Sequence, residues 1–301
     1  MKKRSILCLL ILTVFMIGLA SASTLDVDLE SLDLVMPTKS LTEDFEQEGE
    51  EGTIKVAPVS EQEEITEPAV VSEGFAPNEL EKAIIGRDDR VQINAPGQYP
   101  FSAIANMKVT GACKCKWECT GFMVSRNFLM TAAHCMICPE HNKWAKKVTF
   151  YFGYKSSKNY LYKYTGGWTG LAGTDFPNYR YDNTTMNHDW CYLKLSKNVG
   201  DKTGWMGIRF ASDSEINSGY FQVAGYRDNK LKMDWGNGYA ENINLMTYDA
   251  DDVQGNSGGP VYDFDNYAVA IIAAESNNPP INIGRRITTT IYKYMVGDGF
   301  Q

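Results

Sequence analysis

A histidine, an aspartate and a serine occur in this order in three short segments whose composition favours nucleophilic catalysis. His134 closes an apolar run that ends in TAAHC, Asp189 precedes the apolar segment WCYLKL, and Ser257 lies among small residues in GNSGGP. A serine hydroxyl becomes a good nucleophile when an imidazole removes its proton, and a carboxylate fixes the tautomer of that imidazole. These three residue types together could carry out acyl transfer.

Gly255 adds a second element to this chemistry. A glycine adopts backbone conformations that other residues avoid, so the N–H groups of Gly255 and Ser257 could converge on the oxyanion of a tetrahedral intermediate. Each such donor contributes about 3–4 kcal/mol to transition-state stabilisation. The segment GNSGG also fits the nucleophile turn of α/β-hydrolases, where the catalytic histidine follows the serine. That fold is excluded because His134, His141 and His188 all precede Ser257.

The three segments lie in the body of the chain, residues 83–301. The 82 residues before it differ from the body in composition and form two segments. Residues 1–22 combine three basic residues, an apolar stretch and a terminal Ala-Ser-Ala, which is typical of a secretory signal peptide. Residues 23–82 contain 17 acidic and three basic residues and two aromatic ones. This segment has too little apolar surface to fold a core and predicts a largely disordered acidic propeptide. The alternatives are an uncleaved membrane anchor and a solvating linker.

These segments predict that the protein is exported from the cytoplasm. We expect a secreted protein, extracellular or periplasmic, with no membrane association after signal removal, since no later apolar run is long enough to span a bilayer. The net charge of −8 argues against nucleic-acid binding. No glycine-rich phosphate loop precedes a helix, so we expect no nucleotide or other cofactor.

The body of the chain, residues 83–301, is predicted to be mostly β-structure. Runs of β-branched, aromatic and other apolar residues predict strands at 121–124, 128–131, 148–154, 190–195 and 221–226, and a hairpin made of 260–264 and 267–274. Only residues 287–296 have apolar positions at helical spacing. The body is therefore expected to be all-β and large enough for one large domain or two small barrels.

The cysteines of the body allow two interpretations. They are Cys113, Cys115, Cys119, Cys135, Cys138 and Cys191. An even number in an exported domain predicts disulfides and no metal. The alternative is a zinc site, formed either by Cys115, Cys119, Cys135 and Cys138 or by His134, Cys135, Cys138 and His141.

The segments TAAHC and GNSGGP together resemble the chymotrypsin-like serine proteases, and in particular their bacterial glutamyl-endopeptidase, or V8-like, branch. That branch shares a mature start similar to IIGRDDR at 84–90, a CTG segment at 119–121 and an asparagine at the position of Asn256. The resemblance covers residues 83–295. It implies two perpendicular six-stranded antiparallel β-barrels, at about 90–200 and 201–285, followed by a C-terminal helix.

The resemblance also implies a role for each candidate residue. His134 is expected to be the general base, Ser257 the nucleophile, and Gly255 with Ser257 the oxyanion donors. Asp189 is the expected carboxylate, because the family places it just before an apolar strand; the alternatives are Asp175 and Asp182. A disulfide between Cys119 and Cys135 would tie the histidine loop to the preceding strand. The family implies a monomer that acts on protein or peptide substrates.

Acidic residues indicate which side chain the substrate pocket accepts. The histidine that helps glutamyl endopeptidases bind a glutamate is replaced by Ile272. Asp251 stands six residues before the serine, where trypsin-like members have the aspartate of the pocket floor, and we expect Asp252 and Glu275 beside it. Three acids would repel glutamate and attract a cation. The sequence therefore predicts cleavage after Lys or Arg, with cleavage after Glu as the alternative.

The resemblance also bears on activation. Lys82 precedes the expected mature start, so the activating cut would follow a lysine and could be made by the enzyme itself. Asn256 replaces the aspartate that pairs with the freed N-terminus in trypsin, so how activation is transmitted stays open. The competing hypothesis is an inactive binding protein of the same fold. It is disfavoured because inactive relatives usually lose a triad member or the oxyanion glycine, and this chain keeps them all.

Overall fold

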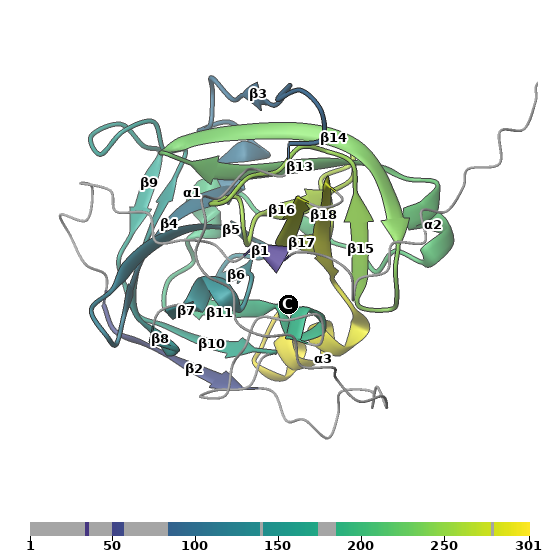
Figure 1. Ribbon diagram of the computed structural model, residues 1–301. Coiled ribbons are helices and arrows are strands. Elements are labelled where there is room, and N and C mark those ends of the chain that lie inside the picture. Colours follow the sequence, from purple (N-terminus) through teal and green to yellow (C-terminus); the bar gives the residue numbers. More distant parts are fainter. Residues whose placement is uncertain (1–33, 36–49, 57–83, 139–140, 174–184, 278–279) are drawn as a thin grey trace, which may run out of the picture.

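Two sheets, formed largely by the two halves of the body, dominate the structure (Figure 1). The computed structural model describes residues 34–35, 50–56, 84–138, 141–173, 185–277 and 280–301. The predicted signal peptide and most of the predicted propeptide lie outside these residues. The predicted all-β fold is confirmed, with short helices and one helix near the C-terminus. Within the described part, no helix is long and apolar enough to span a membrane.

The first sheet surrounds His134. Its strands are β2 (Gly52–Val56), β4 (Ile104–Gly111), β5 (Lys116–Met123), β6 (Phe128–Thr131), β7 (Ile137–Cys138), β8 (Lys143–Phe152), β9 (Tyr162–Tyr164), β10 (Trp168–Ala172) and β11 (Cys191–Leu195). They are hydrogen-bonded in the order β2-β10-β11-β6-β5-β4-β8-β7, with β9 on β8. The six strands from β10 to β8 correspond to the first predicted barrel. All residues of β4 and β6 are buried, so these strands form a rigid support for the histidine.

The second sheet carries Ser257. Its strands are β1 (Leu34–Val35), β3 (Val91–Gln92), β12 (Gly207–Ile208), β13 (Tyr220–Arg227), β14 (Lys230–Ala240), β15 (Leu245–Tyr248), β16 (Pro260–Tyr262), β17 (Tyr267–Asn277) and β18 (Pro280–Arg286). The order β17-β16-β13-β14-β15-β18 returns to its start, because β18 also pairs with β17. Six strands therefore close into a barrel, as predicted, and closure removes the exposed edges of the sheet.

The helices connect and brace the two barrels. They are α1 (Gly200–Thr203), α2 (Asp213–Asn217) and α3 (Thr289–Gly297), with 3-10 turns η3 (Phe101–Ala103), η4 (His134–Met136) and η5 (Thr185–His188). The last helix, α3, is the one predicted at 287–296. Its Ile291 and Met295 are buried in the larger core cluster, which contains residues of both barrels. The rings of Tyr294 and Trp190 stack with centroids 5.9 Å apart. The helix thus supports the start of β11.

Parts of the acidic segment are ordered strands, which differs from the expectation of a largely disordered propeptide. Strand β2 pairs in parallel with β10, and β1 pairs antiparallel with β17, with Val35 opposite Glu275. In β2, Thr53 and Lys55 are exposed and Ile54 is half-buried. Such strands need no core of their own, because they add main-chain hydrogen bonds to an existing sheet edge.

The boundary between the barrels also differs from the prediction. The first barrel was expected to begin at about residue 90, but Gln92 pairs with Lys232 of β14. The N–H of Ile93 continues this contact by donating to the Leu231 carbonyl at 2.9 Å. The start of the body therefore lies on the second barrel, close to the loop that bears Ser257.

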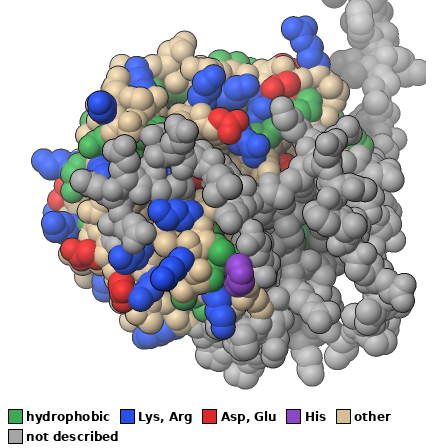
Figure 2. Space-filling view, turned by 60° about the vertical axis from the view of Figure 1, so that its left-hand side comes forward, with side chains coloured by type: hydrophobic (Ala, Val, Ile, Leu, Met, Phe, Trp, Pro, Cys, Tyr) green, Lys and Arg blue, Asp and Glu red, His purple; other side chains and the backbone are tan. Residues whose placement is uncertain are grey.

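One face of the body carries an excess of basic side chains, opposite in charge to the acidic segment. On the face in Figure 2, lysine and arginine side chains are more numerous than aspartate and glutamate side chains. One described contact joins the two parts directly, since Lys146 Nζ lies 2.9 Å from Glu51 Oε1. Opposite charges on a leader and its body favour their association at low ionic strength.

Candidate active site

His134 and Asp189 meet because β6 and β11 are paired. Thr131 of β6 lies opposite Cys191 of β11, so the residues just after the one strand and just before the other are neighbours. Asp189 Oδ2 lies 2.6 Å from His134 Nδ1, and Asp189 Oδ1 accepts a hydrogen bond of 2.9 Å from the His134 backbone N–H. A carboxylate held on Nδ1 fixes the orientation and tautomer of the ring. Nε2 is then the nitrogen available for proton transfer.

The Asp189 carboxylate is buried, and a backbone hydrogen bond holds the turn that carries it. It is fully buried, and His134 is 2% exposed. The Asp189 N–H donates to the Met186 carbonyl at 3.1 Å, which anchors the turn that precedes β11. The two alternative carboxylates, Asp175 and Asp182, lie outside the described residues.

The loop of Ser257 crosses from the second barrel to the first. The Thr120 N–H on β5 donates to the Ser257 carbonyl at 2.9 Å, and the Thr120 hydroxyl donates to the Gly255 carbonyl at 3.0 Å. The Ser257 carbonyl also lies 3.3 Å from Cys135 Sγ, the residue next to His134. These contacts bring Ser257 to the same junction as His134 and Asp189.

Two glycines allow this close approach. Gly258 has φ +82°, and a Cβ built on it would come within 2.2 Å of Thr131 Oγ1 and 2.3 Å of the Thr120 carbonyl oxygen. Gly255 has φ +100°, a conformation that favours glycine. Within the described residues, the N–H groups of Gly255 and Ser257 donate to no backbone carbonyl. No such bond competes with the oxyanion role that the sequence predicts for these two groups.

The predicted disulfide between Cys119 and Cys135 is present, with Cα atoms 5.8 Å apart. It joins β5 to η4, which holds His134. The Trp117 indole N–H adds a second link by donating to the Cys135 carbonyl at 2.7 Å. The bridge also uses two members of one proposed zinc set and one of the other, so neither set forms as predicted.

A small pocket beside Ser257 contains two of the three predicted acids. It is lined by Asp252, Val253, Gln254, Ser257, Ile272, Ala274 and Glu275. Asp252 is 2% and Glu275 6% exposed. Ile272 contributes an apolar wall at the position where glutamyl endopeptidases have a histidine. Two carboxyls and the nucleophile therefore border one space.

Burial controls the ionisation of these two acids. Burial and the nearby negative charge of Asp252 raise the pKa of Glu275 to about 8, although Arg227 and Arg90 act in the opposite direction. Burial raises the pKa of Asp252 to about 6, although its carboxylate accepts a hydrogen bond of 2.9 Å from the Tyr248 hydroxyl. Because the carboxyls interact, they titrate as a pair.

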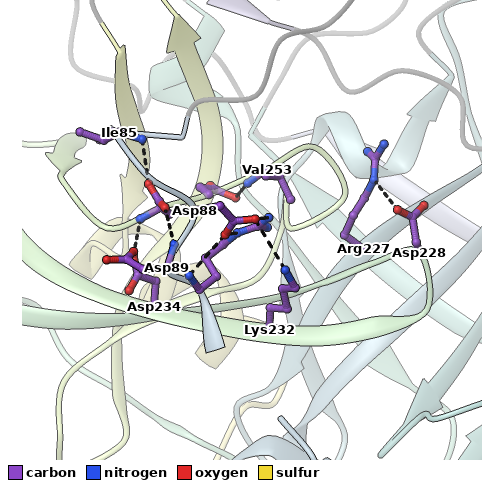
Figure 3. A network of polar contacts seen from close by, with 11 residues as sticks. Ile85, Asp88, Asp89, Arg227, Asp228, Lys232, Asp234 and Val253 are labelled. Carbon is purple, nitrogen blue, oxygen red and sulfur yellow. Dashed lines mark hydrogen bonds and ion pairs between the residues drawn. The ribbon is translucent and has the colours of Figure 1, made fainter. Parts of the chain in front are cut away.

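Asp251 is not among the residues that line this pocket, where it was expected. Its hydrogen-bond partners Ile85, Asp89 and Asp234 are labelled in the polar network of Figure 3. Its Oδ1 accepts a hydrogen bond of 2.7 Å from the Ile85 N–H, and its Oδ2 accepts one of 3.4 Å from the Asp89 N–H. Its own N–H donates to Asp234 Oδ2 at 2.6 Å. Asp251 therefore fixes the start of the body against the second barrel.

Sequence reasoning missed two residues near the pocket. Tyr248, at the end of β15, donates to Asp252. The Arg90 side chain is 5% exposed and bound to Asp88 at 2.9 Å, and its charge acts on both Asp252 and Glu275. The segment IIGRDDR indicated the mature start, but not that its last arginine lies near the pocket.

Comparisons with known proteins identify a matching family and agree with the two-barrel fold. A family model described as Trypsin matches residues 90–295. An extracellular metalloprotease of Bacillus subtilis (strain 168) is 28% identical over 225 residues, which cover 70% of this chain and 67% of the relative. A glutamyl endopeptidase of Bacillus licheniformis is 27% identical over 224 residues, covering 70% of this chain and 63% of the relative. A solved structure of a Glu endopeptidase in complex with MPD matches with a TM-score of 0.60 and 21% identity. The match covers 72% of this chain and 100% of the chain in that structure.

Proposed function

This chain belongs to the trypsin family, and from that premise we propose that it is a secreted serine endopeptidase that acts as a monomer on protein or peptide substrates. The observation that carries the proposal is the buried His134–Asp189 pair next to the docked Ser257 loop. The extracellular Bacillus relative and the predicted signal peptide support secretion. An inactive binding protein would have no need of this arrangement.

The proposed mechanism assigns one step to each group. His134 Nε2 removes the Ser257 hydroxyl proton as Oγ attacks the scissile carbonyl, and the N–H groups of Gly255 and Ser257 bind the oxyanion. His134 then delivers the proton to the leaving amine, which departs and leaves an acyl-enzyme. Water, activated by the same imidazole, releases the acid. Asp189 stabilises the imidazolium that forms in each half-reaction.

A mixed peptide library tests the proposal. The processed chain, from residue 83 onward, is incubated with the library beside a Ser257→Ala control, and cleavage sites are read by mass spectrometry. We expect cuts in the wild-type digest that are absent from the control. Cleavage that persists in the control would exclude Ser257 as nucleophile, and no cleavage by folded wild-type protein would favour a binding protein.

We propose further that the enzyme cleaves after Lys or Arg. Glu275 and Asp252 border the pocket next to Ser257, and a P1 guanidinium or ammonium would neutralise their repulsion. Binding a cation there lowers the pKa of the pair, because an opposite charge favours the ionised form. A P1 glutamate would add a third carboxylate to the same space.

Cleavage after Glu is the second candidate, and a specific observation favours it. Arg90 and Arg227 act on the charge of Glu275 and could counter a substrate carboxylate while Glu275 is protonated. Two of the similar proteins are named for glutamyl activity. The two proposed specificities predict opposite pH dependences of the cleavage rate. Ionisation of Glu275 would favour a cationic P1 residue and oppose an anionic one.

The Glu275→Gln variant separates the two specificities. For P1-arginine substrates we expect kcat/KM to fall about 10- to 100-fold, since a hydrogen bond to a charged group is worth about 1.5–3 kcal/mol. The wild-type to variant ratio should grow as pH rises through the raised pKa of Glu275, about 8, because its negative charge develops there. Asp265→Asn, an exposed acid in the β16–β17 turn, is the matched control. A wild-type preference for P1 glutamate that weakens over the same pH range would overturn the assignment.

We propose that residues 23–82 keep the enzyme inactive until cleavage after Lys82. Support comes from the backbone pairing of Val35 with Glu275, one of the residues that line the pocket. We expect the active enzyme to begin at Ala83, and Lys82→Gln to accumulate as the longer form with at least tenfold lower activity. Sequencing of the N-terminus and an activity assay check this. Lys55→Gln is the control, and full activity of the uncut chain would refute the proposal.

A further inference from the structure

Three cysteines and a histidine outside the active site converge at one end of the first barrel. They are Cys113, Cys115, Cys138 and His141, and their ligand atoms all lie within 4.8 Å of one another. Cys115 Sγ is 3.2 Å and Cys138 Sγ 3.6 Å from His141 Nδ1. This group was not among the zinc sets considered from the sequence, because both of those sets left out Cys113.

The backbone of two hairpins holds these residues in place. In the β4–β5 turn, Lys114 has φ +68°, and the Gly111 N–H donates to the Cys115 carbonyl at 2.9 Å. The second hairpin is formed by β7 and β8. The Ala112 N–H links the β4–β5 turn to it by donating to the Trp144 carbonyl at 3.1 Å. On that hairpin, the Asn142 N–H donates to the Cys138 carbonyl at 2.8 Å. The cluster is therefore built on main-chain contacts that do not depend on its side chains.

Disulfides do not account for the composition of this cluster. The described residues contain one bridge, Cys119–Cys135, and four cysteines outside it. The fourth of these, Cys191, is fully buried on β11, with its Sγ 3.6 Å from the Tyr192 carbonyl. It is not a member of the cluster. Bridging any two of the three clustered thiols would leave a third thiol and an imidazole at the same point.

The separations match the needs of a tetrahedral ion. With Zn–S near 2.3 Å and Zn–N near 2.0–2.1 Å, tetrahedral angles place sulfur and nitrogen about 3.6 Å apart. The two observed sulfur–nitrogen distances, 3.2 and 3.6 Å, lie close to this value. Three sulfurs and one nitrogen form a frequent ligand set of structural zinc.

We propose that Cys113, Cys115, Cys138 and His141 bind one Zn²⁺ ion in a closed structural site. Each thiol releases its proton on binding, and His141 donates the Nδ1 lone pair, so the four positions of the ion are filled by protein and none remains for catalysis. Cys138 follows His134 by four residues and lies in β7, the strand that begins directly after η4. The ion would thus join the tips of two hairpins and brace the segment that carries the catalytic histidine.

Metal analysis of the secreted, processed protein tests the site. The protein is produced with zinc supplied, dialysed, and analysed by plasma mass spectrometry. We expect about one zinc ion per chain in the wild type and in the Cys191→Ala control, and at least a tenfold loss in Cys138→Ser and Cys113→Ser. Equal zinc content in all four proteins, or a wild type without zinc, would overturn the proposal.

Cobalt provides a readout that needs no variant to fold. Wild-type protein stripped by a chelator and loaded with Co²⁺ should show intense visible bands of a tetrahedral thiolate site, and adding Zn²⁺ should remove them. Peptide mapping of the unreduced wild-type protein shows whether the cluster cysteines form a disulfide instead. A disulfide between any two of the three cluster cysteines in the wild type, together with no cobalt bands, would exclude the metal site. Neither readout depends on proteolytic activity, so the site and the proposed function are tested separately.

Discussion

Replacing Ser257 with alanine is expected to lower kcat for peptide hydrolysis by about 10⁴- to 10⁶-fold, the range seen when one member of a catalytic triad is removed. The side chain supplies the nucleophilic oxygen, whereas the contacts that hold the loop use the Ser257 carbonyl and the Thr120 N–H. The variant should therefore keep the wild-type melting temperature. Steady-state kinetics with the preferred peptide and thermal unfolding measure the two quantities.

The control for this variant is Ser214→Ala, which alters an exposed serine of α2. It should leave kcat within twofold of the wild type, since surface substitutions away from special contacts have small effects. If folded Ser257→Ala protein kept more than a tenth of the wild-type kcat, another nucleophile would have to be sought.

Asp189→Asn should be the second most damaging change, with kcat reduced by about 10⁴-fold. The asparagine fits the same space, but its amide can donate to Nδ1 and so stabilise the wrong tautomer of His134. Nε2 would then carry a proton and could not accept one from Ser257. The loss should appear in kcat rather than KM, because the interaction acts in the transition state.

Asp175→Asn and Asp182→Asn serve as the comparison, since both acids were alternatives for the same role. We expect each to retain activity within a few-fold of the wild type. A severe loss in either one, with Asp189→Asn nearly unaffected, would show that the carboxylate assignment is wrong despite the 2.6 Å contact to His134.

Local sequence patterns predicted the strands that support the site. The runs at 128–131 and 190–195 correspond to β6 (Phe128–Thr131) and β11 (Cys191–Leu195). The long strand β14 was not predicted. Its turn, Asp228-Asn229, has both residues at positive φ, 49° and 63°, which is the geometry of a tight hairpin turn. Asp-Asn is a weaker turn signal than Asn-Gly, so the sequence does not mark this hairpin clearly.

The pocket shows why neighbouring residues in sequence cannot be assigned by position alone. Asp251 and Asp252 are adjacent, but one accepts hydrogen bonds from the Ile85 segment and the other lines the pocket. Successive side chains in an extended chain point to opposite sides, so an error of one residue exchanges a pocket acid for a structural one. The sequence fits both alternatives equally well.

The clustering of cysteines depends on pairing between distant strands. Cys113 and Cys138 come together because β4 and β8 are paired near their ends, where Gly111 lies opposite Ala145. Nothing in the spacing of the cysteines shows this register. The even number of cysteines suggested disulfides throughout, whereas the structure uses two in a bridge and isolates Cys191 on β11.

The most direct test of the central claim is labelling with a fluorophosphonate, in which an activated serine oxygen attacks phosphorus and fluoride leaves. The processed wild-type protein is treated with the probe, digested and mapped by mass spectrometry, beside Asp189→Asn and heat-denatured wild type. The account predicts one adduct, on the peptide that contains Ser257, with labelling at least a hundredfold slower in Asp189→Asn and absent after denaturation. An adduct on another residue, or an unlabelled Ser257 in folded protein, would contradict it.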